Sequence, residues 1–157
     1  MADKTFFVVR IRGGIDAQKT VKATLTMLRM EKNNYATIIK DSPSYSGMLK
    51  KAKDYITWGE PTAEVVKTLL EKRGKLPGDV KITDEALKGL GHDSLDALAN
   101  AIASGEVEFS QLNGIKPFFR MHPPKKGFKR TVKRPYNDHG ELGYRGEAIN
   151  ELIKRMC

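Results

Sequence analysis

The first forty residues change from a strand pattern to a helix pattern and back. Residues 5–12, TFFVVRIR, are rich in β-branched and aromatic side chains and stop at a Gly-Gly pair, which predicts a strand. Apolar side chains then recur at helical spacing from Val21 to Leu28, so a helix with one apolar face is expected to end near Asn33-Asn34. Asp16 is placed to cap its start.

The same alternation continues to residue 60. Residues 35–39 predict a second strand, and the turn sequence Asp41-Ser42-Pro43 leads into a helix from about Ser44. Residues 57–59 predict a short third strand. This β-α-β-α-β order indicates an α+β fold with a two-layer core, in which helices cover one face of a small sheet. The other face of the sheet is expected to stay open.

The rest of the chain divides by pattern into two segments after the core of residues 1–60. Residues 61–114 are expected to form a helical insert, with one helix around Val65 to Leu70 and another that opens at Ser94-Leu95-Asp96 and closes at Gly105. Residues 115–157 predict a strand, a long loop and a C-terminal helix. In the strand, Ile115, Phe119 and Met121 alternate with Lys116, Phe118, Arg120 and His122. In the helix, the apolar residues are Ile149, Leu152, Ile153 and Met156.

Charge is concentrated in one segment, which we call the basic arm: Lys116 to Tyr136. It contains eight basic residues and no acidic one, so it carries +8 of the formal net charge of +9. The basic residues are Lys116, Arg120, Lys125, Lys126, Lys129, Arg130, Lys133 and Arg134. A local excess of this size indicates a polyanionic partner, because Lys and Arg displace counterions from phosphates.

Aromatic side chains between these cations favour RNA as the partner. Phe118, Phe128 and Tyr136 can stack on unpaired bases, and the chain contains no helix-turn-helix, zinc-finger or basic-zipper pattern. The alternative is a merely solvated charge run, although such runs usually lack aromatic residues and packed elements at both ends. The glycines at 140, 143 and 146 also have two interpretations: turn formation, or close approach of the backbone to a phosphate beside Arg145.

The sequence contains little that suggests catalysis. His122 and His139 have no carboxylate at a helical or strand spacing that would orient them, and His92, which precedes a helix, is expected to lie at its cap. No metal-ligand spacing is present. The single Cys, Cys157, excludes an internal disulfide framework and fits a reducing cytoplasm. No apolar run is long enough for a membrane helix, and the N-terminal sequence does not predict a signal peptide. We therefore expect a soluble protein without cofactor, metal or small-molecule substrate.

Four stretches of the sequence resemble the archaeal branch of the large-subunit ribosomal protein L-thirty family. They are RIRG, DSPSYSGMLKKAKDYITWGE, FRMHPPKKGFKRTVKRPY and GELGYRGEAINELIKRM. The resemblance implies a core with some likeness to ferredoxin-like folds, extended by an insert and a C-terminal segment that bacterial members lack. It also implies a non-catalytic cytoplasmic protein that binds and braces large-subunit ribosomal RNA close to the 5S RNA, beside other ribosomal proteins.

Candidate RNA-binding residues follow from the arm and from this resemblance. By position, the resemblance adds Arg10, Arg12, Tyr45, Lys50 and Lys51 to the arm residues and Arg145. The full set is Arg10, Arg12, Tyr45, Lys50, Lys51, Lys116, Phe118, Arg120, His122, Lys125, Lys126, Phe128, Lys129, Arg130, Lys133, Arg134, Tyr136 and Arg145. Two other functions remain open at this point: a free-standing RNA-binding regulator, and an enzyme acting on an acidic or nucleotide substrate.

Overall fold

The fold is α+β, as the sequence predicts. The computed structural model describes residues 5–13, 17–76, 80–83, 85, 88, 94–105, 109 and 115–157. The elements in order are β1 (Thr5–Arg10), α1 (Lys19–Met27), β2 (Tyr35–Lys40), α2 (Pro43–Ala52), β3 (Ile56–Gly59), α3 (Ala63–Arg73), β4 (Lys75–Leu76), β5 (Val80–Lys81), α5 (Leu95–Ser104), β6 (Phe119–Arg120), β7 (Thr131–Pro135), β8 (Gly140–Tyr144) and α6 (Ile149–Met156). Short 3₁₀ turns precede β8, at Tyr136–Asp138, and α6, at Gly146–Ala148.

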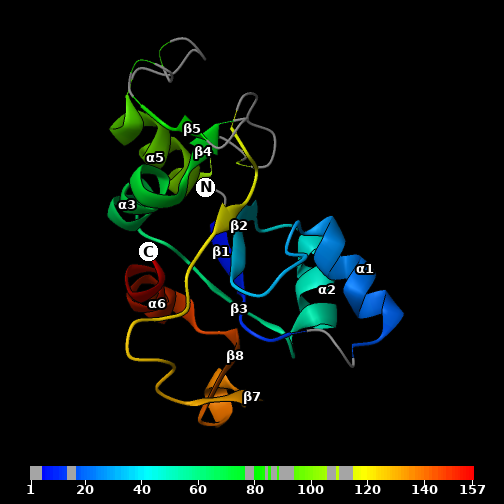
Figure 1. The fold of residues 1–157 in the computed structure, drawn as a ribbon. Helices are drawn as coiled ribbons and strands as arrows, with labels where there is room; N and C mark the ends of the chain where they lie inside the picture. Colours follow the sequence, from blue (N-terminus) through cyan, green and yellow to red (C-terminus); the bar gives the residue numbers. More distant parts are fainter. Residues whose placement is uncertain are drawn as a thin grey trace.

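Six strands form one mixed sheet in the order β6-β2-β1-β3-β8-β7. Strand β1 is antiparallel to both β2 and β3, whereas β8 runs parallel to β3 and β7. The sheet therefore joins strands from residues 5–59 with strands from residues 119–144. Strands β4 and β5 form a separate two-stranded sheet beside α3 and α5 (Figure 1).

Helices cover both faces of the sheet (Figure 1). Val8 of β1 packs with apolar residues of α1 and α2, while its neighbours Phe7 and Val9 pack with α3, α5 and α6. Alternate residues of a strand point to opposite faces, so β1 contributes to two cores. The two-layer β-α-β-α-β unit is present, but the expectation of an open second face is wrong. The insert and the C-terminal helix fill that face.

Helix α1 ends at Met27, about six residues earlier than the apolar pattern suggested. Arg29 has a left-handed backbone with φ of 63°, and its N–H bonds to the carbonyl of Thr26, while the N–H of Met30 bonds to the carbonyl of Leu25. This is the Schellman arrangement that closes many helices, although glycine usually occupies the left-handed position. The expected cap residue Asp16 lies outside the described residues.

Helices α2, α3, α5 and α6 form where the sequence predicts helices, and α5 begins and ends at the predicted residues. The side chains of Ser42, Thr62 and Ser94 accept hydrogen bonds from backbone N–H groups in the first turns of α2, α3 and α5. Gly105 closes α5 with a left-handed backbone. All four apolar residues predicted for α6 are buried: Ile149, Leu152, Ile153 and Met156.

Strand β8 is the main element that the sequence pattern did not reveal. Gly140 allows β7 and β8 to approach closely, since a Cβ at this position would lie 1.8 Å from the carbonyl oxygen of Arg134. Gly143 and Gly146 both have left-handed backbones, with φ of 81° and 58°. Each of these glycines therefore has a structural reason within the protein.

No helix of the described residues is long and apolar enough to cross a membrane. Across the same residues, His, Cys, Asp and Glu side chains do not form a group of three or more that would hold a metal ion.

Candidate nucleic-acid interface

The basic arm presents most of its cations to solvent. Arg120 and all six basic residues from Lys125 to Arg134 are exposed, and Lys116 is half-buried. The alternation predicted for residues 115–122 is confirmed, because Ile115, Phe119 and Met121 are buried, although the strand itself spans only Phe119–Arg120. After β6 the arm passes beside α6 and then forms β7 at the edge of the sheet (Figure 1).

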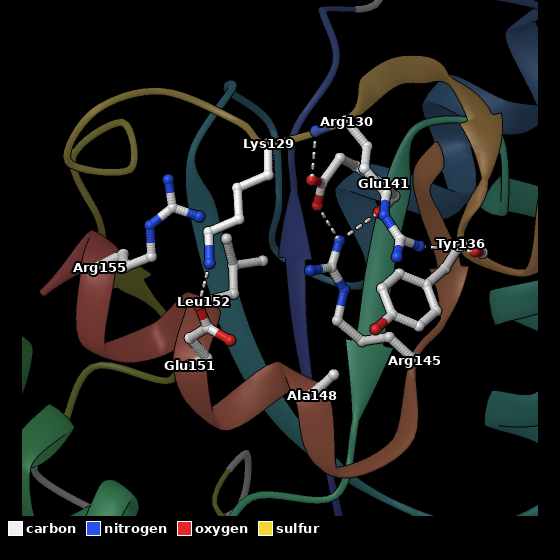
Figure 2. Close-up of a pocket in the computed structure, with 9 residues that line it drawn as sticks. All are labelled: Lys129, Arg130, Tyr136, Glu141, Arg145, Ala148, Glu151, Leu152 and Arg155. Carbon is white, nitrogen blue, oxygen red and sulfur yellow. Dashed lines mark hydrogen bonds and ion pairs between the residues drawn. The ribbon is translucent and has the colours of Figure 1, made fainter. Parts of the chain in front are cut away.

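The first half of the arm is held by α6. The backbone N–H of Lys125 donates to the carbonyl of Arg155 at 2.9 Å, and the Arg155 guanidinium donates back to the carbonyls of Lys125, at 3.0 Å, and Gly127. Lys129 forms an ion pair with Glu151 at 2.5 Å, shown in Figure 2. This pair is solvent-exposed, and the hydrogen bond from Lys129 lowers the pKa of Glu151.

The second half is held by a buried ion pair behind β8. The side chains of Glu141 and Arg145 are each 5% exposed, and their charged groups lie 2.7 Å apart. Glu141 also accepts a hydrogen bond from the backbone N–H of Arg130 at 3.0 Å, which ties the arm to the pair. The Arg145 guanidinium donates further to the Thr57 hydroxyl, at 2.8 Å, and to the carbonyl of Glu141.

Tyr136, at the end of the arm, lies against two guanidinium groups. The carbon at the centre of the Arg130 guanidinium is 4.9 Å from the ring centroid, and that of Arg145 is 5.0 Å from it. These groups line an open cavity of about 200 Å³ between the arm, β8 and α6. Figure 2 shows the lining residues. Most cations that line the cavity are already paired with carboxylates or carbonyls. These interactions therefore serve to anchor the arm rather than to bind a ligand.

Two of the candidate residues lie inside the protein. The guanidinium of Arg10 donates to the carbonyls of Arg12, Met30 and Glu31, and burial lowers its pKa. Arg145 is enclosed in the ion pair described above. Burial leaves neither guanidinium at the surface, so the interface proposed below does not include Arg10 or Arg145.

The remaining candidates are at least partly accessible. Lys50 and Lys51 are exposed on α2, whereas Tyr45 is half-buried against the core beneath that helix. Arg12 lies over the ring of Tyr55, 5.6 Å from its centroid. Phe128 is also half-buried and packs against the core that contains α6.

The surroundings of His122 and His139 do not suggest catalysis. Both ring nitrogens of His122 lie within hydrogen-bond distance of backbone oxygens, at 2.6 Å from Pro123 and 2.5 Å from Cys157. His139 is exposed and has a left-handed backbone at the turn before β8. His92 lies outside the described residues.

Sequence reasoning missed the residues that hold the arm in place. Glu141, Glu151 and Arg155 lie outside the basic segment, and their partners are 4 to 30 positions away in the chain. Their only signal in the sequence is that acidic residues reappear directly after a purely basic segment. That signal does not say which charges would meet.

Comparison with known proteins gives one consistent family. A family model described as ribosomal protein L30p/L7e matches residues 6–56, which span β1 to the start of β3. The large ribosomal subunit protein uL30 of Ignicoccus hospitalis is 48% identical and aligns over 99% of both chains. Those of Staphylothermus marinus and Methanobrevibacter smithii are 47% and 45% identical, over 96% of this chain and 97% and 99% of theirs. With this similarity along nearly its whole length, the chain belongs to the uL30 family of large ribosomal subunit proteins.

Proposed function

We propose that this protein is a non-catalytic, structural constituent of the large ribosomal subunit in the cytoplasm, and that its basic arm binds ribosomal RNA. The observation that carries the proposal is the combination of seven exposed cations with a backbone held by β2, α6 and β8. The proposal extends to a position close to the 5S RNA and to contacts with neighbouring ribosomal proteins, on the basis of the family resemblance.

The anchored arm suits this role because ordering a free loop costs conformational entropy at the moment of binding. Here α6 and β8 hold the arm before RNA arrives, so less of the binding free energy is lost to ordering. Phosphate binding by Lys and Arg also makes affinity salt-dependent. If the arm contacts about six phosphates, affinity should fall on the order of 10³-fold between roughly 50 and 200 mM salt.

The test is replacement of four arm cations by Gln: Lys125, Lys126, Lys129 and Arg130. We expect the variant to be incorporated poorly into reconstituted large subunits and to bind ribosomal RNA with a smaller salt slope. A control with the same charge change replaces Lys72, Lys75, Lys81 and Lys88 around the insert. A second control, Glu151→Gln, releases Lys129 without removing charge from the arm. Normal incorporation of the arm variant would contradict the proposal.

Sedimentation in high salt distinguishes a ribosomal constituent from a free-standing RNA-binding regulator. A constituent stays with the large subunit during sedimentation through sucrose in high salt, because many contacts must break at once. A protein that visits ribosomes transiently is released under those conditions.

A further inference from the structure

A second cavity lies between the end of α1 and the edge of the sheet, away from the residues that anchor the basic arm. We call it the α1–β6 cavity. Its volume is about 210 Å³, and it is lined by Thr26, Arg29, Glu31, Tyr35 and Phe118. The rings of Tyr35 and Phe118 are stacked, with centroids 5.4 Å apart and planes inclined by 17°. Both residues are half-buried.

The surroundings of the stacked rings favour a flat ligand. Tyr35 begins β2 and pairs in register with Arg120 of the edge strand β6, whose guanidinium lies over the Phe118 ring at 5.9 Å from its centroid. The cavity therefore combines aromatic faces with a guanidinium beside them.

The charges that line the α1–β6 cavity favour a base over a phosphate as the ligand. Arg29 and Glu31 are both exposed and carry opposite charges, so the cavity is electrically balanced, unlike the arm. A carboxylate repels a phosphate but accepts hydrogen bonds from the amino groups of a base. Arg29 then remains available for the phosphate next to that base.

The backbone at Arg29 supports a role for its side chain. Its left-handed conformation, with φ of 63°, is disfavoured for every residue except glycine, and glycine is the usual residue at this position of a Schellman motif. The packing of the helix end does not involve the Arg29 side chain, which is exposed, since the buried residues there are Leu25, Leu28 and Met30. An arginine at this position gives up stability that glycine would provide.

We propose that the α1–β6 cavity binds one unpaired RNA base, stacked on the Tyr35–Phe118 pair, with Arg29 on the adjacent phosphate. This inference rests on the proposed function, because it takes RNA as the partner. It assigns a base to the first residues of the arm, where Phe118 meets Tyr35 of β2, whereas the cations of residues 125–134 bind backbone.

The test uses the full chain and a five-nucleotide RNA, UU-2-aminopurine-UU. The fluorescence of 2-aminopurine falls when the base stacks, and the flanking uridines stack weakly. We expect the protein to quench the probe on binding. Phe118→Leu keeps the apolar volume but removes the ring, so it should weaken binding about 5- to 150-fold, the range for loss of one base–aromatic stack. Phe118→Tyr keeps the ring and should bind like the unmodified protein.

Arg29→Gly protects the test against a folding artefact. This variant should have a higher melting temperature and a weaker affinity for the probe, two changes that misfolding cannot produce together. Absence of quenching by the unmodified protein would overturn the inference, as would equal quenching by Phe118→Leu. If the cavity instead binds a side chain of a neighbouring protein in the ribosome, the unmodified protein should not quench the probe.

The outcome for the arm is independent. With the four arm substitutions the probe should still be quenched at saturation, since the cavity is intact. If the unmodified protein does not quench the probe while the arm variant binds ribosomal RNA more weakly, only this inference is contradicted. If the arm variant assembles normally, the proposed function fails whatever the probe shows.

Discussion

Replacement of Glu141 by Gln tests whether the buried ion pair holds β8 and the arm in place. The substitution keeps the size of the side chain but leaves Arg145 charged and 95% enclosed, because its side chain is only 5% exposed. Removing one member of a buried pair costs about 3–5 kcal/mol, since the remaining charge is desolvated without its partner. Arg145 would keep the Thr57 hydroxyl and the carbonyl of residue 141 as acceptors, which places the expected loss towards the lower end of this range.

The loss is measurable by thermal unfolding. For a chain of 157 residues, 1 kcal/mol corresponds to roughly 2–4 °C in Tm, so Glu141→Gln should lower Tm by about 6–20 °C. Fluorescence of Trp58, the single Trp, reports on the right region, because Trp58 pairs with Tyr144 of β8. The control is Asp96→Asn, which breaks the solvent-exposed pair between Lys67 and Asp96 and should cost under about 1 kcal/mol.

A double-mutant cycle separates the pair from its surroundings. Arg145→Met alone leaves the Glu141 carboxylate buried without its cation, whereas the double variant removes both charges of the pair. The double variant should therefore be destabilised by less than the sum of the two single variants. Additive losses, or a loss below about 1 kcal/mol for Glu141→Gln, would refute the reasoning that this pair anchors β8.

Two further predictions concern β8. Gly140→Ala places a Cβ 1.8 Å from the Arg134 carbonyl oxygen, so it should cost roughly 1–3 kcal/mol or more and expose the arm to proteolysis. Gly47→Ala, in α2 with open space around it, is the matched control and should stabilise by about 0.5–1 kcal/mol; equal behaviour of the two would contradict the prediction. Hydrogen bonding of the Tyr144 hydroxyl to the Glu60 carboxylate, at 2.7 Å, raises the pKa of Tyr144 from 10.0 to about 12. The folded protein thus holds this proton more tightly than the unfolded chain, so the stabilisation is complete below about pH 10 and is lost as pH rises towards 12. In an absorbance titration with Tyr144→Phe as the blank, Glu60→Gln should return the transition towards pH 10, and an unchanged transition would count against the hydrogen bond.

Elements with local signals were predictable from the sequence. Strand β1 follows from its β-branched and aromatic run, and α5 follows from Ser94 at one end and Gly105 at the other. In each case the residues that determine the structure lie within the element or next to it. Local propensity, capping and pattern then agree, so the prediction needs no knowledge of the rest of the chain.

Strand β8 lacked such a signal. Its sequence, GELGY, has two glycines and one acid in five residues, a composition that is depleted in strands. Gly140, Glu141 and Leu142 are buried because β8 lies between β3 and β7 and because Arg145 neutralises the acid. Strand β3 is distant in sequence, and the residues of β7 and Arg145 look like ordinary surface residues in the sequence. The same limitation placed Arg10 among the candidate RNA contacts, since residue type alone does not show that three backbone carbonyls surround its guanidinium.

The way the arm is anchored explains how it can be both ordered and strongly cationic. Ordering a basic segment with ion pairs would neutralise the charge on which the proposed RNA contact depends. Here most of the anchors use backbone atoms instead: the N–H groups of Lys125 and Arg130 and the carbonyls of Lys125 and Gly127. The carboxylate of Glu141, which accepts from Arg130, is itself neutralised by Arg145 behind the strand. Among the described contacts of residues 125–134, two side chains use their charged groups as anchors. Lys129 pairs with the exposed Glu151, which a phosphate can replace, and Arg130 donates to the carbonyl of Tyr136 and lies over its ring, neither of which neutralises its charge. The fold therefore orders the arm while leaving its positive charge available for the phosphates of RNA.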